Sequence, residues 1–241
     1  MTTPAPSRRL AADVRAHGHA AWPAFLGPAA CAELRVLSEA LAVGQHAHHY
    51  PKSTRVWDLF KHGDPFIDLL NNALLTTTLK DLLGENFLLS DYSLNMVQPG
   101  QPVDDWHIDY PYNEMPTMVS GSLLGLQCVL PLDPFHEANG ATQLLSGSHA
   151  APHRAGPVGD HEPTIFEAEP GTLLVMAAAT WHRSGFNASS SPRSAILLSF
   201  VERWVRPMSD PPGPGPWGRT ETLRILLGMQ RPPETINGVA I

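Results

Sequence analysis

The feature that most constrains the fold is a series of short apolar segments between residues 86 and 203, each bounded by turn residues. Pairs such as Pro99-Gly100 and Pro170-Gly171 separate these segments. Short segments punctuated by glycine and proline are typical of antiparallel sheets that form a barrel or a jelly roll. We therefore expect strands at residues 87–97, 106–110, 122–130, 142–145, 164–168, 172–176 and 195–201.

Helical periodicity is concentrated near the two ends of the chain. Leu34, Leu37 and Leu41 recur at helical spacing after Pro28, which suits a first helical turn. Similar patterns predict helices at residues 7–18, from 64, at 73–83 and at 221–229, and short strands at 20–25 and 57–60. We expect a mainly β fold with flanking helices that pack outside the barrel.

The domain organisation follows from the same patterns. We expect one domain over residues 1–241. It would consist of a helical flank with the first strands (1–85), the barrel core (86–203), and a Pro/Gly-rich linker with a C-terminal helix (204–241). At 241 residues, 43% of them apolar and 16% charged, the chain can bury a large core.

Charge and cysteine content limit the class of partner. The formal net charge is −7 and no basic stripe is present, which argues against nucleic acid. Cys31 and Cys128 are too few for a disulfide framework. The N-terminus lacks the apolar region of a signal peptide, and no apolar run reaches transmembrane length. We expect a cytoplasmic protein without a membrane partner; the sequence does not indicate an oligomeric state.

His107-Ile108-Asp109 is the first candidate for a metal site. Side chains at positions i and i+2 of a strand share a face, so His107 and Asp109 would point the same way. Imidazole and carboxylate are suitable ligands for Fe(II). A core histidine beside an exposed aspartate is the alternative, and the spacing alone is weak.

His182 and Arg193 are the downstream candidates. His182 follows an apolar strand and could meet His107 across the barrel, or could be a core histidine. Two histidines and one carboxylate leave positions open on a non-haem iron. Arg193 opens another apolar strand, where an arginine is costly to bury unless it is paired. Its partner could be a protein carboxylate or a ligand carboxylate, which a guanidinium binds in a two-pronged geometry.

The combination of five blocks resembles the phytanoyl-CoA dioxygenase family of Fe(II)/2-oxoglutarate oxygenases. The blocks are His107-x-Asp109, the stretch from Asn139-Gly140 to His149, Gly171-Thr172-Leu173-Leu174, His182 to Asn187, and Pro192-Arg193. The resemblance runs from about residue 87 to 203, and more weakly through the N-terminal helices. It implies a double-stranded β-helix, the cupin-like form of the jelly roll.

The resemblance also implies roles for individual residues. His107, Asp109 and His182 match the iron ligands, and Arg193 matches the residue that binds the distal carboxylate of 2-oxoglutarate. Further cosubstrate contacts are implied for Ser184, for Asn95 as in ectoine hydroxylase, and for Gln127 and Thr142. Asn139-Gly140 and Gly147-Ser148-His149 are expected to be structural turns, and His149 is not expected to bind the metal.

The implied reaction is oxidation by O₂ with Fe(II) and 2-oxoglutarate, and ascorbate as the reductant in vitro. It would hydroxylate an unactivated C–H of a small metabolite or natural-product intermediate and release succinate and CO₂. Desaturation, epimerisation or ring formation are alternatives with the same cofactors; a non-catalytic metal-binding barrel or a zinc hydrolase is a less favoured one. Related halogenases replace the carboxylate ligand with a small residue, so Asp109 argues against halogenation.

The substrate is expected to be a small molecule held by aromatic walls. No basic cluster is present for the phosphates of an acyl-CoA. Arg55 and Lys61 are candidate cations for a substrate carboxylate. The candidate walls are Trp57, Tyr92, Trp106, Tyr110, Tyr112 and Trp181.

Overall fold

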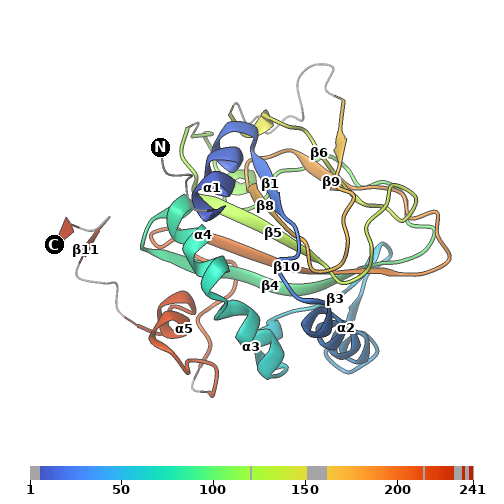
Figure 1. Ribbon diagram of the computed structural model, residues 1–241, viewed down its shortest axis with the longest axis horizontal. Helices are drawn as coiled ribbons and strands as arrows, with labels where there is room; N and C mark the ends of the chain where they lie inside the picture. The colour runs from blue at the N-terminus through green and yellow to red at the C-terminus, as the bar shows by residue number, and fades with distance from the viewer. Residues whose placement is uncertain are drawn as a thin grey trace.

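Two antiparallel sheets form the core of the protein (Figure 1). The computed structural model describes residues 6–119, 121–150, 162–213, 215–230, 235–236 and 239–240. The larger sheet has seven strands in the order β1-β8-β5-β10-β4-β3-β2, and the smaller has the order β7-β6-β9. Neighbouring strands in both sheets pair antiparallel. The fold is a jelly roll, which confirms the expected class.

The strands are short except for the two that cross the middle of the larger sheet. Those two are β4 (Phe87–Val97) and β10 (Arg193–Glu202). The larger sheet also contains β1 (His19–Trp22), β2 (His48–His49), β3 (Ser53–Val56), β5 (Gly125–Pro131) and β8 (Leu173–Ala177). The smaller sheet contains β6 (Thr142–Leu144), β7 (Thr164–Ile165) and β9 (His182–Ser184), and β11 (Thr235–Ile236) pairs with β12 (Val239–Ala240).

Helices pack on one face of the larger sheet, as expected (Figure 1). They are α1 (Pro6–His17), α2 (Pro28–Ala42), α3 (Asp64–Leu70), α4 (Ala73–Leu83) and α5 (Glu221–Leu226). Single turns of 3-10 helix occur at Leu59–Lys61, Tyr112–Glu114 and Ser148–Ala150. Pro28 begins α2 as predicted, and the Asn72 side chain caps α4 by accepting the backbone N–H groups of Leu74 and Leu75. No described helix is long and apolar enough to cross a membrane.

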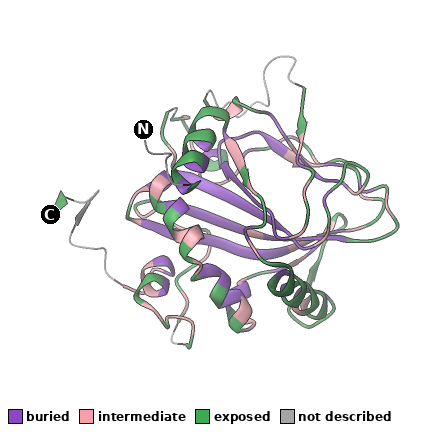
Figure 2. Ribbon diagram, in the orientation of Figure 1, coloured by how far each residue is buried: buried purple, intermediate pink, exposed green. Residues whose placement is uncertain are grey.

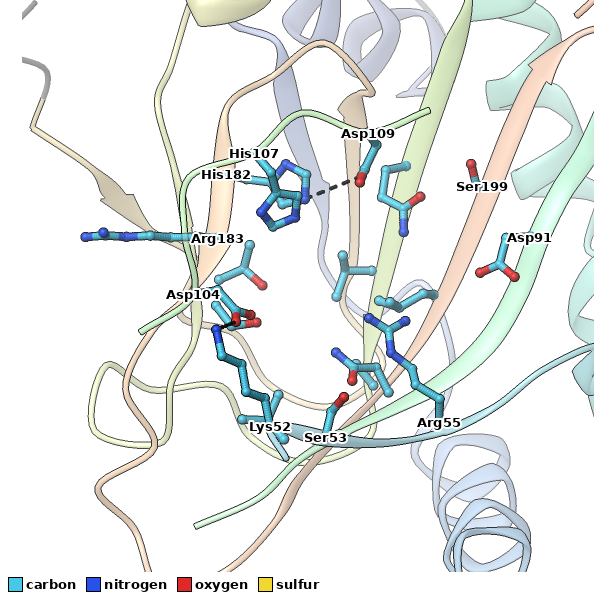
Figure 3. A pocket seen from close by; sticks show the side chains of 18 of the residues that line it. Lys52, Ser53, Arg55, Asp91, Asp104, His107, Asp109, His182, Arg183 and Ser199 are labelled. Carbon is cyan, nitrogen blue, oxygen red and sulfur yellow. Dashed lines mark hydrogen bonds and ion pairs between the residues drawn. The ribbon is translucent and has the colours of Figure 1, made fainter. Parts of the chain in front are cut away.

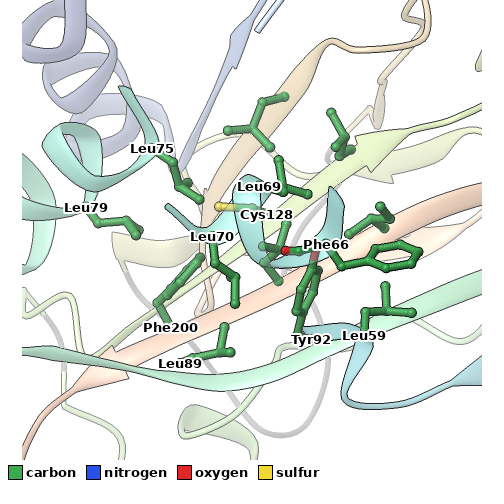
Figure 4. Packing of buried hydrophobic residues seen from close by; sticks show 14 of the residues in the cluster. Leu59, Phe66, Leu69, Leu70, Leu75, Leu79, Leu89, Tyr92, Cys128 and Phe200 are labelled. Carbon is green, nitrogen blue, oxygen red and sulfur yellow. The ribbon is translucent and has the colours of Figure 1, made fainter. Parts of the chain in front are cut away.

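The strands of the larger sheet present two chemically different faces. On β10, Ile196, Leu198 and Phe200 are fully buried in the main core with the helices. Figure 4 shows Phe200 among the buried leucines of this core. The alternate residues Ala195 and Leu197 line a cavity on the opposite face. Side chains alternate along a strand, so one strand can support both the core and the cavity. Figure 2 shows the central strands of this sheet as buried, whereas the helices beside them each have exposed residues.

A β-bulge interrupts this alternation in β4. Ser199 of β10 pairs with Asp91, but Phe200 pairs with Leu89, so Ser90 is the extra residue. Ser90 accepts two backbone hydrogen bonds from the 203–210 segment, from Met208 N to its Oγ and from Ser209 N to its carbonyl, both 3.0 Å. Bulges bend a strand and redirect its side chains. Here the bulge attaches the 203–210 segment beside Asp91.

Two of the predicted strands are wrong. At residues 57–60 the chain forms a 3-10 turn instead, because β3 ends at Val56 and Asp58 adopts a left-handed conformation with φ 55°. Residues 106–110 are not a regular strand; the described chain has only an isolated bridge there, between His107 and His182. A predicted helix at 221–229 ends earlier, at Leu226.

Candidate metal centre

His107, Asp109 and His182 come together at one end of the cavity. One ligand atom from each lies within 4.8 Å of the other two, and no other group of three or more such residues is present in the described chain. His182 Nε2 lies 3.4 Å from Asp109 Oδ2, and the two imidazole centroids are 4.3 Å apart. This spacing suits a single ion bound between two nitrogens and one carboxylate oxygen.

Backbone hydrogen bonds hold the ligands without a regular strand around His107. His107 N donates to His182 O and His182 N donates to His107 O, both at 3.0 Å. Asp109 N donates to Ala178 O at 2.8 Å. The side chains of His107 and Asp109, two positions apart, therefore point to the same place even though the segment is mostly irregular.

Both histidines are fixed in the tautomer that a metal needs. His107 Nδ1 lies 2.9 Å from Asp105 O, and His182 Nδ1 lies 3.0 Å from Thr180 O. A carbonyl only accepts, so each Nδ1 carries the proton and each Nε2 keeps its lone pair for the metal. Burial lowers the pKa of His182, against the opposing charge of Asp109, which favours the neutral ring.

The metal centre opens into a cavity of about 730 Å³ (Figure 3). This volume is in the range of small-molecule sites. Asn95, Gln127, Thr142, Ser184 and Arg193, all expected near a cosubstrate, line it together with the three ligands. They come from β4, β5, β6, β9 and β10, so five strands supply one cavity. Arg193 lies on β10 of the larger sheet, whereas His182 lies on β9 of the smaller one.

Arg193 is a buried cation that forms no ion pair with the described residues. It is 3% exposed, its Nε has no hydrogen-bond partner, and it stacks on Phe135 at 4.1 Å. The nearby carboxylate Asp133 is engaged by Arg35 Nε at 2.7 Å and by Ser194 N at 2.9 Å. Burial lowers the Arg193 pKa to about 10, so it stays protonated at neutral pH. Arg193 is therefore free to bind the carboxylate of a ligand.

Two other polar atoms at the cavity have unmet hydrogen-bonding capacity. Asn95 Oδ1 and Asp109 Oδ2 are buried without a hydrogen-bond partner in the described chain. Such groups are rare in folded proteins and mark places where a water, an ion or a ligand belongs. Both atoms lie on residues expected to contact metal or cosubstrate.

The aromatic walls divide into two groups. Trp57 and Tyr110 line the cavity, as expected. The other four predicted walls, Tyr92, Tyr112, Trp106 and Trp181, are not among the residues that line it. Tyr92 faces the helices and donates to Phe66 O at 3.0 Å, and Tyr112 donates to Ser122 O. Trp181 is buried in a small cluster with Tyr112, and Trp106 packs against that cluster and stacks with Arg183.

The sequence patterns did not single out Asp91, Ser199 and Met208, which also line the cavity. Asp91 and Ser199 share the inner face of their strands with Asn95 and Arg193, so strand alternation could have found part of this set. Of the two candidate cations, Arg55 lines the cavity, whereas Lys61 pairs with Asp58 outside it. Gly140 and Gly147 have φ of +79°, as expected for turns. His149 Nε2 lies 3.1 Å from Arg15 O and is not one of the clustered ligands.

A jelly roll with two histidines and a carboxylate on its cavity wall has the arrangement of the 2-His-1-carboxylate, non-haem class. The chain belongs to the phytanoyl-CoA dioxygenase family, whose model matches residues 14–195.

Individual relatives are distant. The dioxygenase cdmA of Talaromyces verruculosus is 25% identical over 174 residues, covering 69% of this chain and 57% of cdmA. The chain spans about half the length of the curated relatives it matches, for example 57% of cdmA and 48% of cdmD from the same organism.

Solved structures match over nearly the whole chain. The α-ketoglutarate-dependent epimerase SnoN from nogalamycin biosynthesis has a TM-score of 0.72 at 18% identity, covering 99% of this chain and 94% of SnoN. The carbocyclase SnoK has a TM-score of 0.70 at 13% identity, covering 90% of this chain and 98% of SnoK. At these identities the likeness shows the fold.

Proposed function

We propose that the protein is an Fe(II)/2-oxoglutarate-dependent dioxygenase that hydroxylates an unactivated C–H of a small metabolite or natural-product intermediate, releasing succinate and CO₂. The observation that carries the proposal is the placement of the His107–Asp109–His182 cluster and the unpaired Arg193 on one cavity. One provides a metal site and the other a carboxylate site. A 2-oxo acid that chelates the metal needs both.

The residues fit iron by donor type and by tautomer. The two Nε2 atoms and the Asp109 carboxylate would hold it, and three ligands leave positions for a chelating cosubstrate and for O₂. When bound, iron with 2-oxoglutarate and O₂ supplies an oxidant strong enough to break an unactivated C–H bond. The buried orphan Asp109 Oδ2 supports this assignment.

The cosubstrate would lie between the metal and Arg193. Arg193 would bind its distal carboxylate, assisted by the Ser184 hydroxyl, while Asn95, Gln127 and Thr142 supply hydrogen bonds from the surrounding walls. These side chains orient the cosubstrate and exclude water from the metal. We also propose a cytoplasmic location, supported by the two buried free cysteines.

Epimerisation or ring formation is the second candidate outcome. The structural neighbours SnoN and SnoK are described as an epimerase and a carbocyclase, and SnoN was crystallised with Fe3+, α-ketoglutarate and nogalamycin RO. These neighbours favour a natural-product intermediate as substrate. The product mass separates the outcomes, since hydroxylation adds one oxygen atom, whereas epimerisation leaves the mass unchanged and ring formation removes two hydrogens.

The test is succinate release from 2-oxoglutarate with Fe(II), O₂ and ascorbate. Asp109→Ala and His182→Ala should lower succinate formation by more than the roughly 10–100-fold typical of losing an outer partner of a metal ligand. His136→Ala, at an exposed histidine, is the matched control and should keep wild-type activity. Unchanged turnover in both ligand variants, or metal binding without any succinate, would contradict the proposal; the latter would favour a non-catalytic barrel or a zinc hydrolase.

A further inference from the structure

Asp91 is a buried carboxylate that the proposed chemistry does not use. It is 8% exposed, yet it lines the cavity from β4. Figure 3 shows Asp91 and Ser199 on the wall away from His107 and His182. The other cavity-lining carboxylates have an evident reason to be there: Asp109 is in the metal cluster, Asp104 pairs with Lys52 at 3.1 Å, and Glu114 is exposed.

The protein compensates Asp91 only in part. Ser93 Oγ donates to Asp91 Oδ2 at 2.8 Å, and the backbone of Tyr92 adds a further hydrogen bond. In the described chain, no cation lies within ion-pair distance of it, although the positive charge of Arg55 acts on it from further away. Burial is the largest influence and raises the pKa of Asp91 to about 6. At neutral pH a mostly ionised carboxylate therefore faces the cavity with acceptor capacity to spare.

Backbone hydrogen bonds beside Asp91 fix the strand where this buried carboxylate lies. The bulge at Ser90 sits directly before it, and both Ser90 hydrogen bonds attach the 203–210 segment at the same point. Tyr110, next to the metal ligand pair, donates to Arg206 O and attaches that segment from the other side. Tyr110 and Met208 line the cavity from these two segments. The lining of the cavity that Asp91 faces therefore includes side chains, Tyr110 and Met208, that are not part of the proposed metal and cosubstrate set.

We propose that Asp91 is a substrate-recognition residue that accepts a hydrogen bond from a donor group of the substrate, a hydroxyl or a protonated amine. The inference rests on the proposed function and narrows its substrate class. The substrate carries this donor at the end remote from the C–H that faces the metal. Arg55, stacked over Trp57 at 5.6 Å, and the Ser199 side chain lie on the same side of the cavity as Asp91 (Figure 3). An entirely apolar substrate would desolvate the carboxylate further without adding a hydrogen bond to those from Ser93 and Tyr92.

The test uses three small probes of similar size: cyclohexanol, cyclohexylammonium and methoxycyclohexane. Each is titrated by ligand-observed NMR into protein loaded with 2-oxoglutarate and Zn(II), a diamagnetic substitute for iron. We expect at least one of the two donors to bind and methoxycyclohexane to bind at least about tenfold more weakly. Asp91→Ala should weaken donor binding by about tenfold or more, and Asp91→Asn should weaken cyclohexylammonium more than cyclohexanol. A preference for cyclohexylammonium over cyclohexanol identifies an amine, and the reverse identifies an alcohol.

The control variant is Glu114→Gln, which removes an exposed carboxylate from the same cavity and should change no affinity. The inference is overturned if neither donor binds the wild type, if methoxycyclohexane binds as tightly, or if Asp91→Ala binds the donors unchanged. If Asp91→Ala does not fold, Asp91→Asn decides. Binding of 2-oxoglutarate is measured in parallel. If the wild type does not bind 2-oxoglutarate, the proposed function fails. If an Asp91 variant still binds 2-oxoglutarate but binds the donor probes more weakly, the variant affects substrate recognition alone.

Discussion

Several residues of the cavity carry polar atoms that are available to a ligand. Arg193 Nε, Asn95 Oδ1 and Asp109 Oδ2 are buried and lack hydrogen-bond partners in the described chain. Each unmet group costs about 1–3 kcal/mol, so three in one cavity would be a heavy penalty without an occupant. All three atoms belong to residues that the sequence predicted as contacts of the metal or the cosubstrate. The sequence could predict them because their spacing and neighbours resemble a known family.

Arg193 offers a direct test of the cosubstrate position. Arg193→Met removes the charge at similar length, and we expect the KM for 2-oxoglutarate to rise at least about 30-fold, corresponding to about 2 kcal/mol for an unpaired buried charge. Arg183→Met is the control, because Arg183 also lines the cavity but is held by Gln143 at 2.8 Å and by Trp106. Steady-state succinate kinetics give both values. An equal KM in the two variants would place the carboxylate elsewhere.

Asp91 should make the folded protein less stable at neutral and alkaline pH. Its pKa is about 6 in the folded protein and 3.8 when unperturbed, so the folded state holds the proton more tightly. Stability from this group is therefore present at low pH and falls as the pH rises through about 4 to 6. Above pH 6 the full penalty applies, at most about 3 kcal/mol.

Asp91→Asn should accordingly be about 1–2 kcal/mol more stable than the wild type at pH 8, with the difference vanishing near pH 4. Urea unfolding of both proteins at the two pH values measures it, with Glu114→Gln as an exposed control. If Asp91→Asn is less stable than the wild type at pH 8, the ionised carboxylate stabilises the folded protein, and the prediction is wrong.

At the scale of elements, strand alternation explains both the correct and the incorrect predictions. Asn95 and Tyr92 are three residues apart on β4, so they face opposite sides, and only Asn95 can line the cavity. Strand alternation, applied to the sequence alone, would have placed Tyr92 and Asn95 on opposite faces. The bulge at Ser90 could not be predicted, because it depends on pairing between β4 and a strand about a hundred residues away.

The two faces of β10 should respond differently to truncation. Leu198 is fully buried in the main core, and Leu198→Ala should cost about 2–5 kcal/mol of unfolding free energy. Leu197 is only partly buried and lines the cavity, so Leu197→Ala should cost less than half as much. Chemical unfolding of the two variants provides a matched comparison on adjacent residues. Similar losses would mean that the cavity face is as tightly packed as the core.

For the whole molecule, the fold class was predictable and the strand pairing was not. Turn signals and short apolar segments are local, and they indicated a jelly roll with external helices. The pairing of β1 with β8 joins residues about 150 positions apart, and no local pattern specifies it. The C-terminal helix illustrates the same limit: its apolar face was visible, but its contacts, such as Thr220 with Asn71, were not.

The irregular segment around His107 has a consequence for the mobility of the apo protein. Three backbone connections from this segment, to Ser184, His182 and Ala178, tie it to β9 and the end of β8. A metal ion bound by His107, Asp109 and His182 would act as a cross-link between this segment and β9. Ligand binding at a hundred times its dissociation constant adds about 2.7 kcal/mol to the bound conformation.

Amide hydrogen exchange should report this cross-link. Adding Mn(II) and 2-oxoglutarate should slow exchange at His107 and Asp109 by up to about 100-fold if these amides exchange by local opening of the segment. Exposed amides of α2, away from the cavity, should keep their rates. Equal rates at His107 with and without the metal would mean that the segment is already rigid. The metal would then serve the chemistry alone, whereas a slowed rate would make cofactor loading the step that orders the wall of the cavity.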